Sequence, residues 1–148
     1  LRLGEGESAG AAAAPVALGQ LPEMLAGQLA QRRARFLAYA LAVRKAQPAE
    51  GLAFAERAMA LAKGKSPEVA DTLAWIYHLM GRHAEAALML QGVVKAAPDR
   101  AELRLHAAVV FASVGRLEEA AVELREAVRL QPEMESRDEV KALRARLK

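Results

Sequence analysis

Cysteine is absent from this sequence of 148 residues, which excludes disulfide bonds and thiolate metal ligands. Aromatic residues make up only 4% of the chain, and the runs of valine, isoleucine and threonine that build β-sheets are missing. No apolar run approaches the roughly 20 residues that a membrane-spanning helix needs, so we expect no membrane span. What is present is a composition that is 53% hydrophobic and rich in alanine, the best helix former. The sequence therefore predicts an all-α fold.

An excess of charge of one sign is also missing. The formal net charge is only +3, and most basic residues alternate with acidic ones, as they do on solvated helix faces. Two basic clusters are exceptions, Arg32-Arg33-Arg35 and Lys141-Arg144-Arg146-Lys148. Proteins that bind nucleic acids usually concentrate more positive charge on one face, so we interpret both clusters as solvated surface and expect no nucleic-acid partner. RNA binding by a helical array is kept as an alternative, which salt-sensitive binding would support.

Motifs for catalysis are missing as well. The sequence contains no glycine-rich phosphate loop and no Gly-x-Ser-x-Gly nucleophile elbow. No serine neighbours a histidine in the sequence. Paired carboxylates such as Glu118-Glu119 lie at an expected helix start, where negative charge favours the helix dipole. We therefore expect neither an enzyme nor a bound cofactor.

The three histidines are His78, His83 and His106. His83 follows an expected turn and is interpreted as a packing residue. His78 and His106 fall on first helices of adjacent units and, with Asp71 or Glu102, could form a metal site. Two imidazoles without a ligand-spacing signature are weak support for a metal. We expect no metal, and interpret His78 and His106 as solvated side chains or as side chains that line a groove.

An internal repeat of 34 residues is the strongest positive signal in the sequence. Gly81 recurs as Gly115, 34 positions later. The same shift relates Tyr77 to Phe111, Ala74 to Ala108, Ala86 to Ala120, Leu90 to Leu124 and Pro98 to Pro132. Glycine, alanine, aromatic and proline positions return in phase, which a high alanine content alone would not produce. A fixed period of this length is typical of stacked helical hairpins.

Each repeat unit is predicted to contain two helices. In the first unit Ser66 precedes Pro67, a pair typical of the N-cap and the first helical position. Gly81 ends this helix, because glycine adopts the left-handed conformation at low cost. The second helix is expected from about His83 to Lys95, and Pro98 prevents its continuation.

The next unit follows the same pattern. Asp99 is expected to cap its first helix, Gly115 lies at the turn, and Pro132 ends the second helix. Apolar residues at spacings of three and four form the expected buried stripe of the first helix, namely Leu103, Ala107, Val110 and Phe111.

The two units resemble a known family. They contain the segments Leu73-Ala74-(two residues)-Tyr77-(three)-Gly81-(four)-Ala86 and Ala107-Ala108-(two)-Phe111-(three)-Gly115-(four)-Ala120, each followed by a proline. This pattern resembles the tetratricopeptide repeat, with repeats at 67–100 and 101–134. The resemblance implies an α-solenoid of antiparallel helix pairs, wound as a superhelix whose first helices line the concave face.

A degenerate repeat is expected at about 31–65. Its segment Leu37-Ala38-Tyr39-Ala40-Leu41 is similar to Leu73-Ala74-Trp75-Ile76-Tyr77. Ala46-Gln47-Pro48 stands where a turn glycine is expected, so the sequence leaves the geometry of this turn open. A helix is also predicted over Pro22–Gln31, either continuous with this repeat or the end of a lost one.

The two ends complete the expected array of residues 21–148. Ser136 and Glu139 match the Ser-x-x-Glu capping box and predict a C-terminal capping helix at 136–148. Residues 1–20 are rich in glycine and alanine and are expected to be a flexible linker or tail. The chain begins at Leu1, which suggests a fragment of a longer protein or a processed product.

By the repeat count of the family, ten residues are expected to face the concave groove: Arg32, Arg35, Tyr39, Glu68, Asp71, Trp75, His78, Glu102, Leu105 and Val109. Trp75 and Tyr39 are the expected anchors for a partner, because large aromatic side chains dominate binding energy where they are available. The alternative for Trp75 is packing against the N-terminal segment or a neighbouring helix.

The lysine and asparagine clamp with which some members of the family bind a carboxylate is absent. Glu68, Asp71 and Glu102 would repel a C-terminal carboxylate, so we expect a partner with apolar anchors and some basic character.

These patterns predict a scaffold that binds a protein or peptide. The usage of alanine, arginine and leucine resembles that of GC-rich bacteria. The run from Leu37 to Gly81 is also similar to terminal repeats of bacterial tetratricopeptide proteins linked to envelope or exopolysaccharide export. The sequence leaves the location of this chain open between the cytoplasm and the periplasm of a bacterium. Self-association into a homo-oligomer within a larger assembly is the alternative, which a concentration-dependent mass would support.

Overall fold

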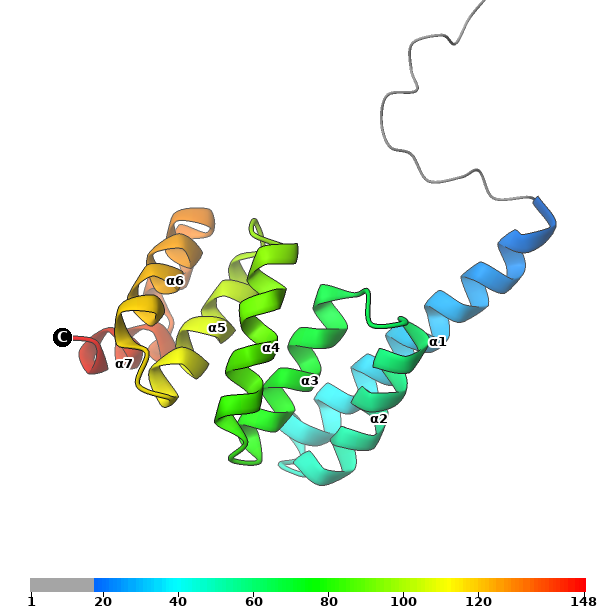
Figure 1. Cartoon of the computed structure of the whole chain (residues 1–148), viewed down its shortest axis with the longest axis horizontal. Helices are drawn as coiled ribbons and strands as arrows, with labels where there is room; N and C mark the ends of the chain where they lie inside the picture. The colour runs from blue at the N-terminus through cyan, green and yellow to red at the C-terminus, as the bar shows by residue number, and fades with distance from the viewer. Residues whose placement is uncertain (1–17) are drawn as a thin grey trace, which may run out of the picture.

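The computed structural model describes residues 18–148, which form a row of antiparallel α-helix pairs (Figure 1). The helices are α1 (Leu21–Tyr39), α2 (Pro48–Leu61), α3 (Pro67–Leu79), α4 (His83–Ala96), α5 (Ala101–Ser113), α6 (Leu117–Leu130) and α7 (Asp138–Arg146). Within the pairs α1 packs on α2, α3 on α4 and α5 on α6, and contacts of α2 with α3 and of α4 with α5 join one pair to the next. Further contacts of α1 with α3, and of α3 with α5, place the first helices of the pairs in one layer. The predicted all-α solenoid is confirmed.

The N-terminal helix is longer than its partner. The segment predicted as helical at Pro22–Gln31 runs without interruption into the first repeat as part of α1. Figure 1 shows the first turns of α1 extending beyond the rest of the array. Of the expected flexible segment 1–20, only Leu18–Gln20 lie within the described residues, and they form a 3-10 turn.

The turns inside the helix pairs differ between the first repeat and the later ones. Gly81 and Gly115 have φ angles of 84° and 83°, as the prediction of turn glycines requires. In the first repeat, α1 instead continues into a π-helical turn over Ala40–Arg44, where the Lys45 amide donates to the Ala40 carbonyl at 3.1 Å. Ala46 then adopts a φ of 54° in the left-handed region. The turn of this repeat therefore consists of a π-helical segment followed by an alanine, instead of a glycine, in the left-handed conformation.

The helix caps follow the sequence only in part. The Ser66 hydroxyl accepts a hydrogen bond from the Val69 amide at 3.3 Å, which confirms the predicted N-cap of α3. The other two predicted caps are wrong. Arg100 rather than Asp99 occupies the N-cap of α5, and it makes no capping bond. Arg137 rather than Ser136 precedes α7, because residues 132–136 form a 3-10 turn in which the Ser136 hydroxyl donates to the Glu133 carbonyl at 3.0 Å.

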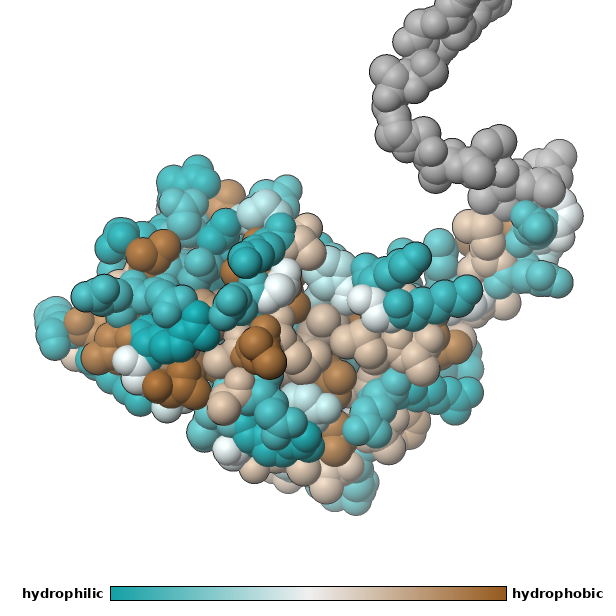
Figure 2. Space-filling view, in the orientation of Figure 1, coloured by the Kyte–Doolittle hydropathy of each residue, from teal (hydrophilic) through white to brown (hydrophobic). Residues whose placement is uncertain are grey.

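The hydrophobic core is unevenly distributed. Its largest cluster spans α3 to α7 and includes Leu90, Phe111 and Leu124, each at most 3% exposed. α7 covers the end of this cluster with Val140 and Leu143, as expected of a capping helix. Figure 2 shows hydrophilic residues over the α6 side of the array and weakly hydrophobic ones gathered over α2 and α3. None of the helices in residues 18–148 combines the length and the apolar character needed to cross a bilayer.

Candidate binding groove

A groove lies along the first-helix layer of the array. It has a volume of about 540 Å³ and is lined by residues of α1, α3 and α5 together with Arg137 and Glu139 at the start of α7. Most of the sequence-predicted residues meet here, namely Arg35, Tyr39, Glu68, Asp71, Trp75 and Glu102. The layer of first helices therefore forms a hollow surface in which side chains from distant parts of the sequence lie close together.

A second compartment of about 360 Å³ adjoins the groove at Trp75, which lines both. His78 and Val109, two further predicted groove residues, lie in this compartment. α7 supplies its other wall through Ala142, Leu143 and Arg146. The Arg146 guanidinium donates to the Ala112 carbonyl of α5 at 3.1 Å, which ties this wall in place. The compartment is mostly apolar, and α7 forms one of its walls.

Two predicted groove residues lie elsewhere. Leu105 is only 1% exposed and belongs to the core cluster of α3 to α7, so the expectation that it faces the groove is wrong. The same cluster contains Met134 of the 3-10 turn, itself fully buried, and Val140 and Leu143 of α7. Arg32 is exposed on α1 and lines neither compartment.

Trp75 is held between imidazole rings. Its indole stacks on His106 with a centroid distance of 4.4 Å and an interplanar angle of 25°. His78 lies on the same aromatic cluster, 5.0 Å from Trp75 and tilted by 40°. Trp75 therefore lies in the groove and at the same time packs against a neighbouring helix, so both alternatives considered for it hold in part. This packing fixes the orientation of the ring without removing it from the surface.

The imidazoles themselves are hydrogen-bonded. His106 Nδ1 lies 2.8 Å from the Asp71 carboxylate, and His78 Nδ1 lies 2.8 Å from His83 Nδ1. Burial works against the charged form of His106, but the hydrogen bond and the charge of Asp71 outweigh it and raise the pKa of His106 above its usual value. Burial, followed by repulsion from the two other histidines, lowers the pKa of His78. The pKa values of His106 and His78 are thus shifted in opposite directions.

This arrangement differs from the metal site considered from the sequence. Asp71 contacts His106, Glu102 pairs with Arg137, and His78 contacts His83 instead of joining His106 and a carboxylate. Within residues 18–148, no group of three or more histidine, aspartate or glutamate side chains is placed to hold a metal ion.

The groove carboxylates are already paired. Glu68 forms an ion pair with Arg100, and Glu102 forms one with Arg137 at 2.6 Å. Burial opposes the charge of Glu68, but the backbone hydrogen bond and Arg100 outweigh it and lower the pKa of this carboxyl. These ion pairs were not predicted, because Arg100 and Arg137 precede helices and lie outside the counted groove positions. The expectation of free negative charge in the groove therefore needs correction.

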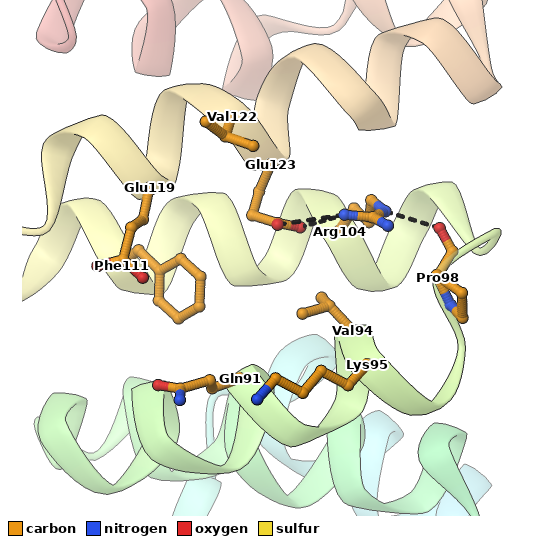
Figure 3. A pocket seen from close by; sticks show the side chains of 9 residues that line it. All are labelled: Gln91, Val94, Lys95, Pro98, Arg104, Phe111, Glu119, Val122 and Glu123. Carbon is orange, nitrogen blue, oxygen red and sulfur yellow. Dashed lines mark hydrogen bonds and ion pairs between the residues drawn. The ribbon is translucent and has the colours of Figure 1, made fainter.

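Another cavity, of about 530 Å³, is lined by residues of α4, α5 and α6 that take no part in the groove (Figure 3). Its main polar feature is an ion pair of 2.9 Å between Arg104 and Glu123, whose side chains are 15% and 12% exposed. Arg104 also donates to the Pro98 carbonyl at 2.7 Å. These bonds tie the α4–α5 turn to α6, so the charged groups in this cavity already serve the fold.

Comparisons with known proteins agree with this architecture. Residues 77–147 match the sequence model of the family described as "Tetratricopeptide repeat". A search of the curated proteins finds no match.

Solved structures with the same fold include the Arabidopsis OM64 TPR domain, with a TM-score of 0.69 and 19% identity over 82% of this chain and 96% of that one. YrrB, described as a TPR protein with an unusual peptide-binding site, has a TM-score of 0.63 and 19% identity over 85% of this chain and 69% of that one. The Yersinia enterocolitica type III secretion chaperone SycD, solved in complex with a peptide of the translocator YopD, has a TM-score of 0.59 and 18% identity over 78% of this chain and 85% of that one. Residues 77–147 therefore belong to the tetratricopeptide repeat family, and residues 18–148 have the fold of a tetratricopeptide solenoid.

Proposed function

We propose that this chain is a protein–protein interaction module whose groove holds a peptide segment of a partner. The observation that carries the proposal is the position of Trp75 between two spaces. One is the groove of about 540 Å³, which is lined by charged side chains and is called the charged compartment from here on, and the other is the apolar compartment of about 360 Å³. Such a surface selects a ligand with an apolar side chain next to polar groups, which is how small sites combine affinity with orientation. Similar folds in YrrB and in SycD, whose descriptions name a peptide-binding site and a bound peptide, support this proposal by analogy.

The apolar compartment is the anchor site of the proposed complex. Trp75, Val109 and Leu143 surround a volume of about 360 Å³, which is large enough for one bulky aliphatic or aromatic side chain. Because Trp75 is already oriented by His106 and His78, little side-chain entropy is lost when a ligand packs on its free edge. A preorganised aromatic wall of this kind is typical of the residues that dominate binding energy.

The charged compartment sets the polarity of the ligand. Its lining contains Arg35, Arg100 and Arg137 together with four carboxylates, those of Glu68, Asp71, Glu102 and Glu139. Since most of these carboxylates are paired, a strongly basic ligand gains less than the sequence suggested. We therefore propose a ligand that is close to neutral and exchanges hydrogen bonds with these pairs at the rim of the apolar anchor.

A selected peptide tests the proposal. A random peptide library is selected against the full chain, and binding of the best peptide is followed by the emission of Trp75, the only tryptophan of the chain. Ala142→Phe then fills the apolar compartment from an exposed position of α7. Ala145→Phe is the matched control, because Ala145 is exposed on the same helix and lines neither compartment.

We expect Ala142→Phe to weaken binding about tenfold or more and Ala145→Phe to leave it unchanged. Equal affinity of both variants for the peptide, or a selection that yields no peptide able to change the emission of Trp75, would contradict the proposal.

A further inference from the structure

The outer face of α1 carries a line of exposed apolar side chains, Leu21, Leu25, Leu29 and Phe36, here called the α1 face. Leu25, Leu29 and Phe36 are 57%, 62% and 61% exposed. All residues from 21 to 29 are exposed, as this part of the helix extends beyond the array (Figure 1). A helical segment without packing partners is marginally stable in water. The α1 face therefore gains stability from any partner that covers it.

The α1 face is continuous with the groove. Residues three, four and seven positions apart share one side of a helix, so Leu25, Leu29, Phe36 and Tyr39 lie on one side of α1, with Arg32 on the same side between Leu29 and Phe36. Tyr39, the last residue of α1, lines the charged compartment. Val43, in the π-helical turn that follows, also lines it. Ala34 and Ala38, which are buried, lie on the opposite side of the helix. A ligand on the α1 face would thus follow one side of α1, past Arg32, into the groove.

After Glu23, the charge around the α1 face is positive. Between Glu23 and Glu50 the chain contains no acidic residue, while its basic residues there are Arg32, Arg33, Arg35, Arg44 and Lys45. Within residues 18–148 none of these side chains forms an ion pair with a carboxylate, and Arg44 lies over the Phe36 ring at 5.9 Å. In the later helices, by contrast, a series of arginines is paired: Arg82, Arg100, Arg104, Arg116, Arg129, Arg137 and Arg144.

These properties select among the possible occupants. A second copy that docks through its own α1 would bring the same unpaired arginines, and the only acidic residue of that helix is Glu23. A nucleic acid would pair with the arginines and leave the leucines in water. An anionic bilayer suits a basic apolar helix, but a flat surface does not follow the path that continues through Tyr39 into the groove. A helix with an apolar stripe flanked by carboxylates matches both the leucines and the arginines.

We propose that the α1 face docks an acidic amphipathic helix of a partner protein. The leucines and Phe36 pack against the apolar stripe of the partner helix, and Arg32 and Arg33 pair with its carboxylates. This site is separate from the apolar compartment beside Trp75 and does not depend on a ligand there.

Three labelled peptides of about 20 residues test the proposal with the full chain, by fluorescence anisotropy. The first has leucine at every third and fourth position and glutamate elsewhere on the polar face. The second replaces the glutamates by lysine, and the third replaces the leucines by serine. We expect only the first peptide to bind, with an affinity that falls as salt is added. Absence of binding by the first peptide, or equal binding by the second, overturns the proposal.

Variants locate the site. Leu25→Gln combined with Leu29→Gln should weaken binding of the acidic peptide about tenfold or more, whereas the matched control Leu88→Gln, on α4 and 72% exposed, should not. Arg32→Glu combined with Arg33→Glu should transfer the preference to the lysine peptide, a reversal that unfolding cannot produce. Ala142→Phe should leave these affinities unchanged, which separates this site from the apolar compartment beside Trp75.

Two further readouts decide against the proposal. If light scattering shows a dimer that Leu25→Gln with Leu29→Gln dissociates, and the acidic peptide does not compete with it, a second copy covers the α1 face. If vesicles containing phosphatidylserine, or a single-stranded RNA, bind through the same residues while the acidic peptide does not, the occupant is a membrane or a nucleic acid.

Discussion

The first helix pair and the two that follow share a fold but are held together differently. Every buried residue of α1, its π-helical extension and α2 is alanine or glycine: Ala34, Ala38, Ala42, Gly51, Ala55 and Ala58. The pairs α3–α4 and α5–α6 instead bury large side chains such as Ile76, Leu90 and Phe111. Small residues allow close approach of the backbones but remove little apolar area from water, so the first repeat gains less stability from burial than the others.

Core truncation is the largest expected effect and tests this comparison directly. Leu90→Ala removes a fully buried side chain from α4 and should lower the free energy of unfolding by about 2–5 kcal/mol. Met59→Ala in α2 removes a side chain that is only partly buried and should cost about half as much or less. Urea denaturation of both variants measures the difference. Equal costs would mean that the first repeat is packed as firmly as the second.

Two glycines on second helices give the next largest contrast. A Cβ at Gly51 would lie 2.6 Å from the Ala38 carbonyl oxygen, whereas a Cβ at Gly92 in α4 would meet nothing within 4 Å. Gly51→Ala should therefore destabilise the protein by about 1–3 kcal/mol through overpacking. Gly92→Ala should stabilise it by about 0.5–1 kcal/mol, since alanine favours the helix. Thermal unfolding followed by circular dichroism compares the two variants, and the same sign of effect for both would refute the close contact at Gly51.

Substitutions in the turns within the helix pairs should change the stability less, and in opposite directions in the first and the third pair. Ala46 has a φ of 54°, a conformation that costs a residue with a Cβ about 1 kcal/mol. Ala46→Gly should relieve this cost and raise the stability by somewhat less than about 1 kcal/mol, because glycine also gains entropy in the unfolded chain. Gly115→Ala, the converse change at a φ of 83°, should lower it by about the same amount. Chemical denaturation that shows both changes to be destabilising would mean that the turn of the first repeat does not need glycine.

The pH dependence of stability is the smallest expected effect, and the two histidines that produce it lie in the later repeats. The pKa of His106 is raised in the folded state by Asp71, so the stabilising charge is fully present below the unfolded pKa, near 6.5, and is lost as the pH rises through the higher folded pKa. The lowered pKa of His78 acts in the opposite sense, because stability falls as the pH drops from about 6.5 through its folded pKa.

His106→Gln should remove the first of these contributions and His78→Gln the second. Denaturation curves between about pH 5 and 8 measure both, with Tyr39→Phe in the first repeat as the control that changes neither. A His106→Gln variant that keeps the wild-type pH profile would contradict the proposed role of the Asp71 contact.

Local chemistry made much of this fold predictable. The glycines at 81 and 115 take left-handed φ angles, and Ser66 caps α3, because each of these roles depends on a few neighbouring residues. The groove positions Trp75, Glu68 and Asp71 followed from the repeat count, and they line the groove in the structure.

Two of the features that the sequence did not predict depend on residues far apart in the chain, and a third depends on a competing local turn. Leu105 is buried in the cluster that also contains Met134 of the C-terminal turn and Val140 and Leu143 of α7. Arg137 neutralises Glu102 across the gap between α7 and α5, and no local pattern relates the two. Ser136 lost its expected capping role because the backbone before α7 closes into a 3-10 turn. In the first two cases a tertiary contact decides the outcome, whereas Ser136 is placed by a local turn that competes with the predicted cap.

The small buried residues between α1 and α2 also determine which helices of the array unfold locally first. In a repeat array each unit is stabilised only by its neighbours, so the ends fray first. Here one end is sealed by Val140 and Leu143 of α7, while the other ends in a pair without a large buried side chain. Hydrogen exchange should therefore be fastest in α1 and slow progressively toward α6. A partner that clamps α1 would close the weaker end and, through mass action, raise the unfolding temperature of the whole array.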